Sequence, residues 1–122
     1  MDFTIQQKVI GLYALMPEEI NIREIKRIKL HNWFYQRKKE DSSIFGDLKF
    51  NWDGPYPSSK HIDYINSTLK TVASLSKNLY DFCKDYFNEN MKPRMNKKEL
   101  DRMERLSKSL FDFLSSNQPL LF

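Results

Sequence analysis

Apolar residues recur at three- and four-residue intervals along most of this 122-residue chain, the spacing that places them on one face of an α-helix. The first such segment covers about residues 3–16 and starts with Thr4 and Gln7, whose spacing is typical of a capping box. Proline disfavours helical geometry in the residue before it, so Pro17 should end this helix. The pattern predicts a mainly α fold.

Two further helices are predicted in the second half of the chain, over about residues 58–87 and 96–116. Residues 75–82 match residues 106–113 at six of eight positions, either by duplication of a helix or because two amphipathic helices share one periodicity. The two apolar faces are similar and the connector is short, so we expect the helices to close as a long antiparallel hairpin.

Another helix is predicted nearer the amino terminus, from Asn21, with Glu24 three residues later, through Arg37. Its apolar side chains, including Trp33 and Phe34, spread around most of the helix instead of forming one stripe. Either the helix is sandwiched between two elements of the core, or its aromatic end serves a partner.

The middle of the chain changes to a two-residue rhythm that is typical of a half-buried strand. Leu48, Phe50 and Trp52 alternate there with polar residues, and residues 44–45 are the candidate partner strand. A lone two-stranded ribbon is only marginally stable, so this small β-hairpin or wing should pack on the helices.

The segment 50–57 combines aromatic residues with turn residues. Gly54 and Pro55 suit a turn in which Trp52 and Tyr56 pack against each other. The other interpretation is a recognition loop that presents Tyr56 beside the basic helix described below.

These elements predict a single domain over residues 1–122 with a winged-helix-like first portion, residues 1–57, made of two helices and the β-hairpin. The second portion, residues 58–122, is the helical hairpin. Tyr80, Phe111 and the apolar residues 120–122 would form an exposed patch for a protein partner or for a second copy of the chain in a homodimer.

The net charge of +4 is distributed unevenly. Between residues 23 and 39 seven basic residues face one acidic residue, so this segment carries +6 and the rest of the chain carries −2. A smaller basic group follows at Lys92, Arg94, Lys97 and Lys98. The charge either solubilises one helix face or contacts an anionic partner, and nearby aromatic rings favour the second reading. The candidate residues for binding nucleic acid or a protein partner are Arg23, Lys26, Arg27, Lys29, Arg37, Lys38, Lys39, Trp33 and Tyr56.

Several kinds of chemistry are excluded by residue counts. The single cysteine, Cys83, allows neither an intrachain disulfide nor a multi-cysteine zinc site, and three scattered glycines form no phosphate-binding loop. The two histidines, His31 and His61, lack metal-ligand spacing. No apolar run approaches 18 residues and the amino terminus lacks a signal-like segment, so we expect a cytoplasmic protein without membrane contact, metal or cofactor.

No catalytic group is recognisable either, so the chain is not expected to be an enzyme. Cys83 is expected as a small core residue. The alternative is an enzyme that uses His31 or Cys83.

Residues 27–30 (RIKL), the following Trp33-Phe34-Tyr35, and an aromatic segment running into Gly54-Pro55-Tyr56 occur in an order that resembles the Panacea (SocA-like antitoxin) group of small prokaryotic proteins. The resemblance covers residues 5–75. It implies a non-catalytic regulator of bacterial toxin–antitoxin or phage-conflict systems, working by binding another macromolecule in the cytoplasm of a bacterial or phage-infected host cell.

The leading functional hypothesis is therefore a small non-catalytic regulator, antitoxin-like, that binds a protein partner through its terminal helical hairpin. The alternative is a nucleic-acid-binding regulator that uses the basic helix 22–39, with the ribbon 48–56 as a wing.

Overall fold

The computed structural model describes residues 2–19, 25–75 and 78–116, and over this part of the chain the fold is mainly helical, as predicted. None of the described helices is long and apolar enough to cross a membrane. In chain order the helices are α1 (Ile5–Ala14), α2 (Arg27–Glu40), α3 (Ser42–Phe45), α4 (Lys60–Leu75), α5 (Leu79–Asn90), the 3-10 helix η2 (Lys92–Arg94) and α6 (Lys97–Leu114).

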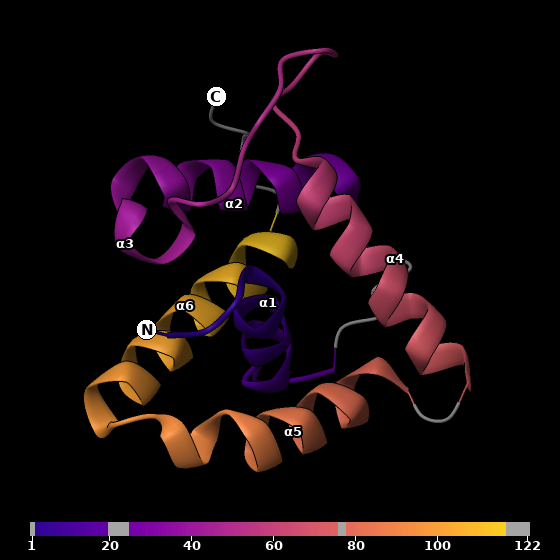
Figure 1. The fold of residues 1–122 in the computed structure, drawn as a ribbon. Helices are drawn as coiled ribbons and strands as arrows, with labels where there is room; N and C mark the ends of the chain where they lie inside the picture. The colour runs from indigo at the N-terminus through magenta and orange to yellow at the C-terminus, as the bar shows by residue number, and fades with distance from the viewer. Residues whose placement is uncertain (1, 20–24, 76–77, 117–122) are drawn as a thin grey trace.

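Helix α1 lies at the centre of the molecule, with α2, α4, α5 and α6 arranged around it (Figure 1). The predicted single apolar stripe would bury one side, but eight of its ten residues are buried, because neighbours cover several of its faces. Gly11 faces two of these neighbours: a Cβ there would lie 3.4 Å from Cε of Met91 and 3.5 Å from Cδ2 of Phe87, which are ordinary contact distances. The first helix of the sequence is therefore the core of the fold.

Two of the predicted helix starts are confirmed by capping boxes. The helix predicted from Asn21 instead begins at Arg27, and Asn21 and Glu24 lie outside the described residues. The Thr4 hydroxyl accepts the N–H of Gln7 at 3.1 Å, and the Gln7 side chain accepts the N–H of Thr4 at 3.0 Å. Asn96 and Glu99 form the same pair at the start of α6. Such boxes depend only on residues three apart, so the sequence is sufficient to predict them.

The predicted β-hairpin is wrong, and with it the winged-helix-like description. Residues 44–45 belong to the short helix α3, which the Asp41 carboxylate starts by accepting the N–H of Ser43 at 2.9 Å. Helical geometry lets Phe45 pack on Phe34, with ring centroids 5.4 Å apart. In the described residues the only β-type pairing is an isolated bridge between Asn51 and Ser58, because α3 leaves residues 48–52 without a partner strand.

The single helix predicted over residues 58–87 is also wrong, since α4 ends at Leu75 and α5 begins at Leu79. Asn78 starts α5 by accepting the N–H of Asp81 at 2.8 Å. The similar segments 75–82 and 106–113 consequently differ in structure: the first spans the junction of two helices, with residues 76–77 outside the described part, and the second lies within α6.

The predicted long antiparallel hairpin is not formed. Helix α6 instead passes α2 in the opposite direction, so that Lys29 contacts the end of α6 at Phe113 and Asp41 pairs with Arg102 near its start. Between these points the Trp33 indole N–H donates to the Ser109 hydroxyl at 3.2 Å. Helix α6 buries its apolar face against α1 and α2, and for this reason it does not pair with the helix before it.

The interpretation of α2 as a sandwiched helix is confirmed. Trp33 is 3% exposed and Phe34 is fully buried, in one apolar cluster that draws on all six α-helices. Trp33, predicted as a residue that contacts a partner, therefore lies in the core. Cys83 lies in the same cluster, as expected for a small core residue.

Candidate binding surface

A loop formed by residues 51–58 rises above α2 and leads into α4 (Figure 1). Two backbone hydrogen bonds close it, from Asn51 N to Ser58 O at 2.8 Å and from Ser58 N to Asn51 O at 3.0 Å. The loop presents Trp52, whose side chain is 57% exposed, while Tyr56 is half-buried. A closed loop with an exposed tryptophan is the starting point for a binding surface.

One flank of the 51–58 loop rests on the second half of α2. The ring of Tyr35 meets the rings of Phe50 and Trp52 edge-on, with centroids 5.3 Å and 6.0 Å away. The ammonium of Lys39 lies 5.4 Å from the centroid of the same Tyr35 ring. An aromatic cluster with an adjacent cation is therefore held at this end of α2, with Trp52 exposed and with Tyr35 and Phe50 half-buried.

The other flank of the loop is tied to the start of α2 by Tyr56. Its hydroxyl accepts a hydrogen bond from Nη1 of Arg27 at 2.7 Å. Arg27 also holds Asp63 through two parallel bonds, Nε to Oδ1 at 2.8 Å and Nη2 to Oδ2 at 2.5 Å. Arg27, predicted as a nucleic-acid contact, is thus engaged in joining the loop, α2 and α4.

His31 lies beneath this pair and is fully buried. Its Nδ1 accepts the backbone N–H of Ser59 at 2.9 Å, so the ring hydrogen must be on Nε2, which donates to Oδ1 of Asp63 at 2.9 Å. Burial lowers the pKa of His31, which keeps the ring neutral, although Asp63 opposes the shift. Burial alone would raise the pKa of Asp63, but hydrogen bonds from Arg27 and His31 lower it below its usual value.

These contacts describe a structural network and offer little for catalysis. The Nδ1 lone pair of His31 is occupied by a backbone N–H, so the ring has no free nitrogen for a substrate proton. Burial raises the pKa of the Cys83 thiol to about 12, far from the range of a reactive thiolate. Within the described ranges, no three His, Cys, Asp or Glu side chains gather in a group that could hold a metal ion.

Most of the predicted basic contacts in α2 are used inside the molecule. Lys29 donates to backbone carbonyls at the end of α6, including that of Phe113 at 3.3 Å. Arg37 pairs with Glu40 at 3.0 Å. Lys38 donates to the backbone carbonyl of Leu48. These three cations are engaged by the end of α6, by Glu40 and by the segment before the loop, so they do not form one continuous phosphate-binding face.

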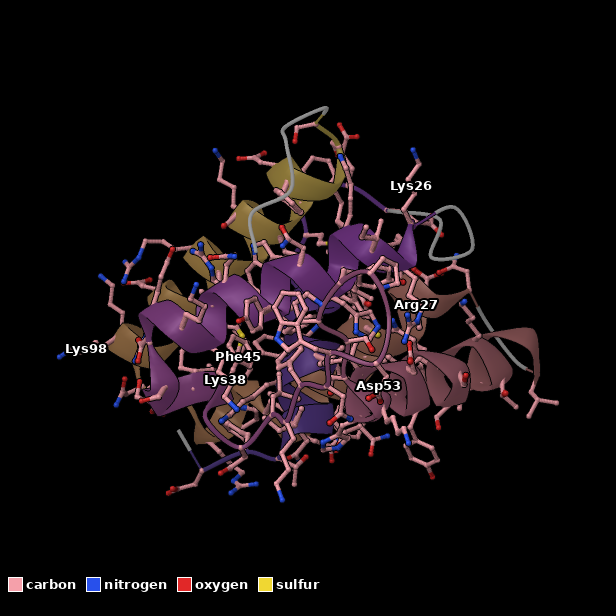
Figure 2. All side chains as sticks on the ribbon, turned by 90° about the horizontal axis from the view of Figure 1, so that it is seen from above. Lys26, Arg27, Lys38, Phe45, Asp53 and Lys98 are labelled. Carbon is pink, nitrogen blue, oxygen red and sulfur yellow. The ribbon has the colours of Figure 1, made fainter. Side chains whose placement is uncertain are left out.

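Three further residues of the predicted basic set are not among these internal contacts. Lys26 and Lys39 are exposed, at opposite ends of α2, and Arg23 lies outside the described residues. The second basic group is exposed as well, but Figure 2 places Lys98 at the edge of the molecule opposite Lys26. The second basic group therefore lies on the side of the Lys39 end of α2, where Asp41 pairs with Arg102 of α6, and away from Lys26.

The apolar patch that was expected to contact a protein partner or a second copy of the chain is also less exposed than predicted. Tyr80 is half-buried and donates its hydroxyl to the Met16 carbonyl at 2.9 Å, and Phe111 is half-buried too. Residues 120–122 lie outside the described part of the chain. The terminal helices thus present less apolar surface than the sequence pattern indicated.

Sequence reasoning missed Asp63, one residue of this network. Asp63 carried one usable signal, because an acidic residue in the first turn of a helix favours its N-terminus. Nothing local indicated that it would meet Arg27, which is 36 residues away in the sequence.

Comparison of the chain with protein-family models, with curated proteins and with solved structures gave no match. The function is therefore argued from the surface itself.

Proposed function

We propose that this protein is a small non-catalytic regulator that binds a protein partner through the 51–58 loop. The observation that carries the proposal is the 57% exposure of Trp52 on a loop that is closed by backbone hydrogen bonds and tied to α2 on both flanks. The loop takes the place of the terminal helical hairpin that was expected to contact the partner.

Tryptophan is among the residues that most often dominate the affinity of protein–protein interfaces. A loop that is already held in its bound shape loses little conformational freedom on binding, so more of the contact energy is available for affinity. The contacts of Trp52 with Tyr35 and of Tyr56 with Arg27 provide this preorganisation. The partner should offer an apolar pocket for the indole, with carboxylates near Lys39.

The antitoxin-like form of this proposal makes the partner a toxin or phage-conflict protein in the cytoplasm of a bacterial or phage-infected cell. It rests on the resemblance to the Panacea group, and one contact supports it. The two segments that carry the resemblance, residues 27–35 and residues 54–56, meet in space through the bond between Arg27 and Tyr56.

The proposal is tested by affinity purification of the tagged protein from its source cells, beside Trp52→Ala and Tyr64→Ala. Tyr64 is the matched control, since its side chain is 68% exposed but lies on α4, outside the loop. We expect the wild type and Tyr64→Ala to retain one stoichiometric protein, and Trp52→Ala to lose it. Recovery of the wild type alone, or equal retention by Trp52→Ala, would refute the proposal.

Nucleic-acid binding is the second candidate, because the Lys39 cation lies beside the Tyr35–Trp52 aromatic cluster, an arrangement that suits stacked bases of a single strand. Its test is binding of a labelled oligonucleotide over a series of salt concentrations. Lys39→Ala should weaken binding more than Lys38→Ala, since the Lys38 ammonium is engaged by the Leu48 carbonyl. Equal effects of the two substitutions, or affinity that does not change with salt, would exclude this candidate.

A further inference from the structure

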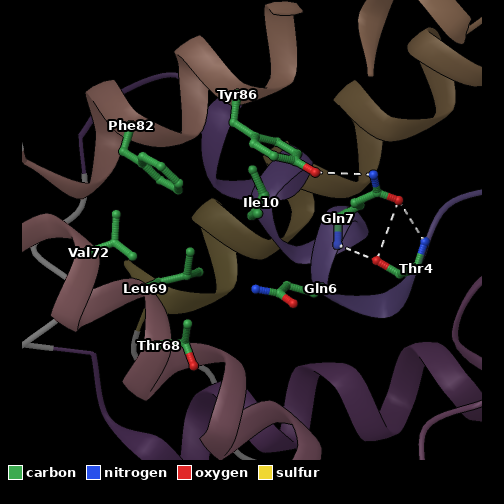
Figure 3. Close-up of a pocket in the computed structure, with 9 residues that line it drawn as sticks. All are labelled: Thr4, Gln6, Gln7, Ile10, Thr68, Leu69, Val72, Phe82 and Tyr86. Atoms are coloured by element: carbon green, nitrogen blue, oxygen red, sulfur yellow. Dashed lines mark hydrogen bonds between the residues drawn. The ribbon is translucent and has the colours of Figure 1, made fainter. Parts of the chain in front are cut away.

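A pocket of about 290 Å³ opens between α1, α4 and α5, and none of its lining residues belongs to the 51–58 loop (Figure 3). Its volume is near the lower end of the range of about 300–1,000 Å³ that is usual for small-molecule sites. The pocket is therefore large enough for a compact small molecule.

The apolar part of the lining comes from three helices. Ile10 of α1 and Leu69 of α4 are 3% and 1% exposed and close the floor. Val72 of α4 and Phe82 of α5 are half-buried and form the walls. No charged side chain is among the described lining residues, so an ion in this pocket would lose its hydration without gaining a counter-charge.

The polar end of the pocket has a defined donor and acceptor pattern. The Gln7 carboxamide oxygen accepts the backbone N–H of Thr4 at 3.0 Å, and this bond fixes the orientation of the amide because a backbone N–H can only donate. The Gln7 NH₂ group therefore faces Tyr86, whose hydroxyl accepts from it at 3.2 Å. The hydroxyl hydrogen of Tyr86 is left as a donor that can meet a ligand carbonyl.

Gln6 supplies a second polar group at the mouth. Its side chain extends toward the pocket in Figure 3, and no described residue bonds its carboxamide. The group offers both a donor and an acceptor, so it can pair with an amide or a similar function of a ligand.

The geometry points to a binding site for a neutral, mainly apolar small molecule that carries one amide-like polar group. The apolar body of the ligand would lie on Ile10, Leu69 and Phe82, its carbonyl would accept from Tyr86, and its N–H would donate to Gln6. This site is independent of the partner surface proposed for the 51–58 loop.

Three probes of the same shape and different charge test the chemistry: benzamide, benzoate and benzamidine, each followed by ¹H–¹⁵N NMR titration of the full chain. We expect benzamide to shift amide signals around Ile10, Leu69 and Phe82, and to bind at least about tenfold more tightly than either ion. Equal binding of all three probes, or no shifts at these residues with millimolar benzamide, would overturn the inference.

A matched pair of variants tests the location. Thr68 lines the pocket and Thr71 does not, yet both hydroxyls donate to the carbonyl four residues earlier at 3.0 Å. Thr68→Phe should fill the mouth and weaken benzamide binding at least about tenfold, whereas Thr71→Phe should leave it unchanged. Equal effects of the two substitutions would contradict the placement.

A third variant tests the polar end, and it changes no apolar contact. Tyr86→Phe removes the hydroxyl donor, so it should weaken benzamide binding while leaving the binding of ethylbenzene, which has no polar group, as in the wild type. Equal losses for both probes, or no loss for benzamide, would refute the assigned role of Tyr86.

Discussion

His31 and Asp63 are joined by a 2.9 Å hydrogen bond from Nε2 to Oδ1 that links α2 to α4. The same imidazole accepts the N–H of Ser59, the residue that follows the closing pair of the 51–58 loop and precedes α4. One buried ring therefore holds α2, α4 and the base of the loop together. The base of the loop that carries Trp52 is thus anchored to a buried histidine.

Replacing His31 by phenylalanine should destabilise the protein, because the buried N–H of Ser59 would lose its acceptor. We expect a loss of about 1–3 kcal/mol in the free energy of unfolding, measured by urea denaturation. His61→Phe is the control, since His61 is exposed on α4 and should change stability by less than about 0.5 kcal/mol. Similar losses in both variants would argue against the network.

Acid should destabilise the wild type in a way that requires His31. The pKa of His31 is lowered from 6.5 in the folded protein, so below that pH the unfolded chain binds a proton that the folded chain does not. Stability should therefore be complete above pH 6.5 and fall as the pH drops below it, with a slope of up to about 1.4 kcal/mol per pH unit. Urea midpoints from pH 7.5 down to pH 5 should show this slope in the wild type and a flatter profile in His31→Phe.

Asp63 should matter more as an acceptor for His31 than as the ion-pair partner of Arg27. The side chains of Arg27 and Asp63 are 48% and 38% exposed, so water screens their attraction and Arg27→Ala should cost only about 0–1 kcal/mol. Asp63→Ala leaves the buried Nε2–H of His31 without its acceptor and should cost about 1–3 kcal/mol.

Asp63→Asn is the control for this comparison, because its amide oxygen still accepts from His31. It should be more stable than Asp63→Ala. If Arg27→Ala proved as destabilising as Asp63→Ala, the ion pair and not the histidine bond would be the main contribution.

Gly11 tests how tightly the central helix is packed. A Cβ at this position would make ordinary contacts with Met91, Phe87 and Met103 at 3.4–3.6 Å. Gly11→Ala should thus raise stability by about 0.5–1 kcal/mol through its higher helix propensity. Gly11→Leu should lower the melting temperature, since the larger side chain would push α5 and α6 away from α1. A stable Gly11→Leu variant would contradict the close packing.

Much of the helical structure follows from short-range features of the sequence. The capping box at Thr4, the helix start at Asn96 and the end of the first helix before Pro17 were predicted correctly, because each depends on residues only a few positions apart. The Asn78 cap uses the same chemistry, but it was overlooked because the apolar spacing continues across it. Because this cap was overlooked, α4 and α5 were predicted as one helix.

Short-range features of the sequence could not predict which elements pack against each other. Ile44 and Phe45 fit a strand as well as a helix by composition, and contacts with Phe34 and Trp33 favoured the helix. Likewise, α6 was expected beside the preceding helix and lies against α1 and α2. Such outcomes depend on which apolar faces can be buried together over the whole chain.

The sequence by itself determined a mainly helical protein with capped helices, a buried cysteine and a surplus of positive charge in residues 23–39. Only the tertiary structure decided what that charge does. Arg27, Lys29 and Lys38 found their partners in Asp63, the end of α6 and the Leu48 carbonyl, from 10 to 84 residues away. Such pairs form only after apolar burial has brought the helices together, and for that reason no local pattern could assign them.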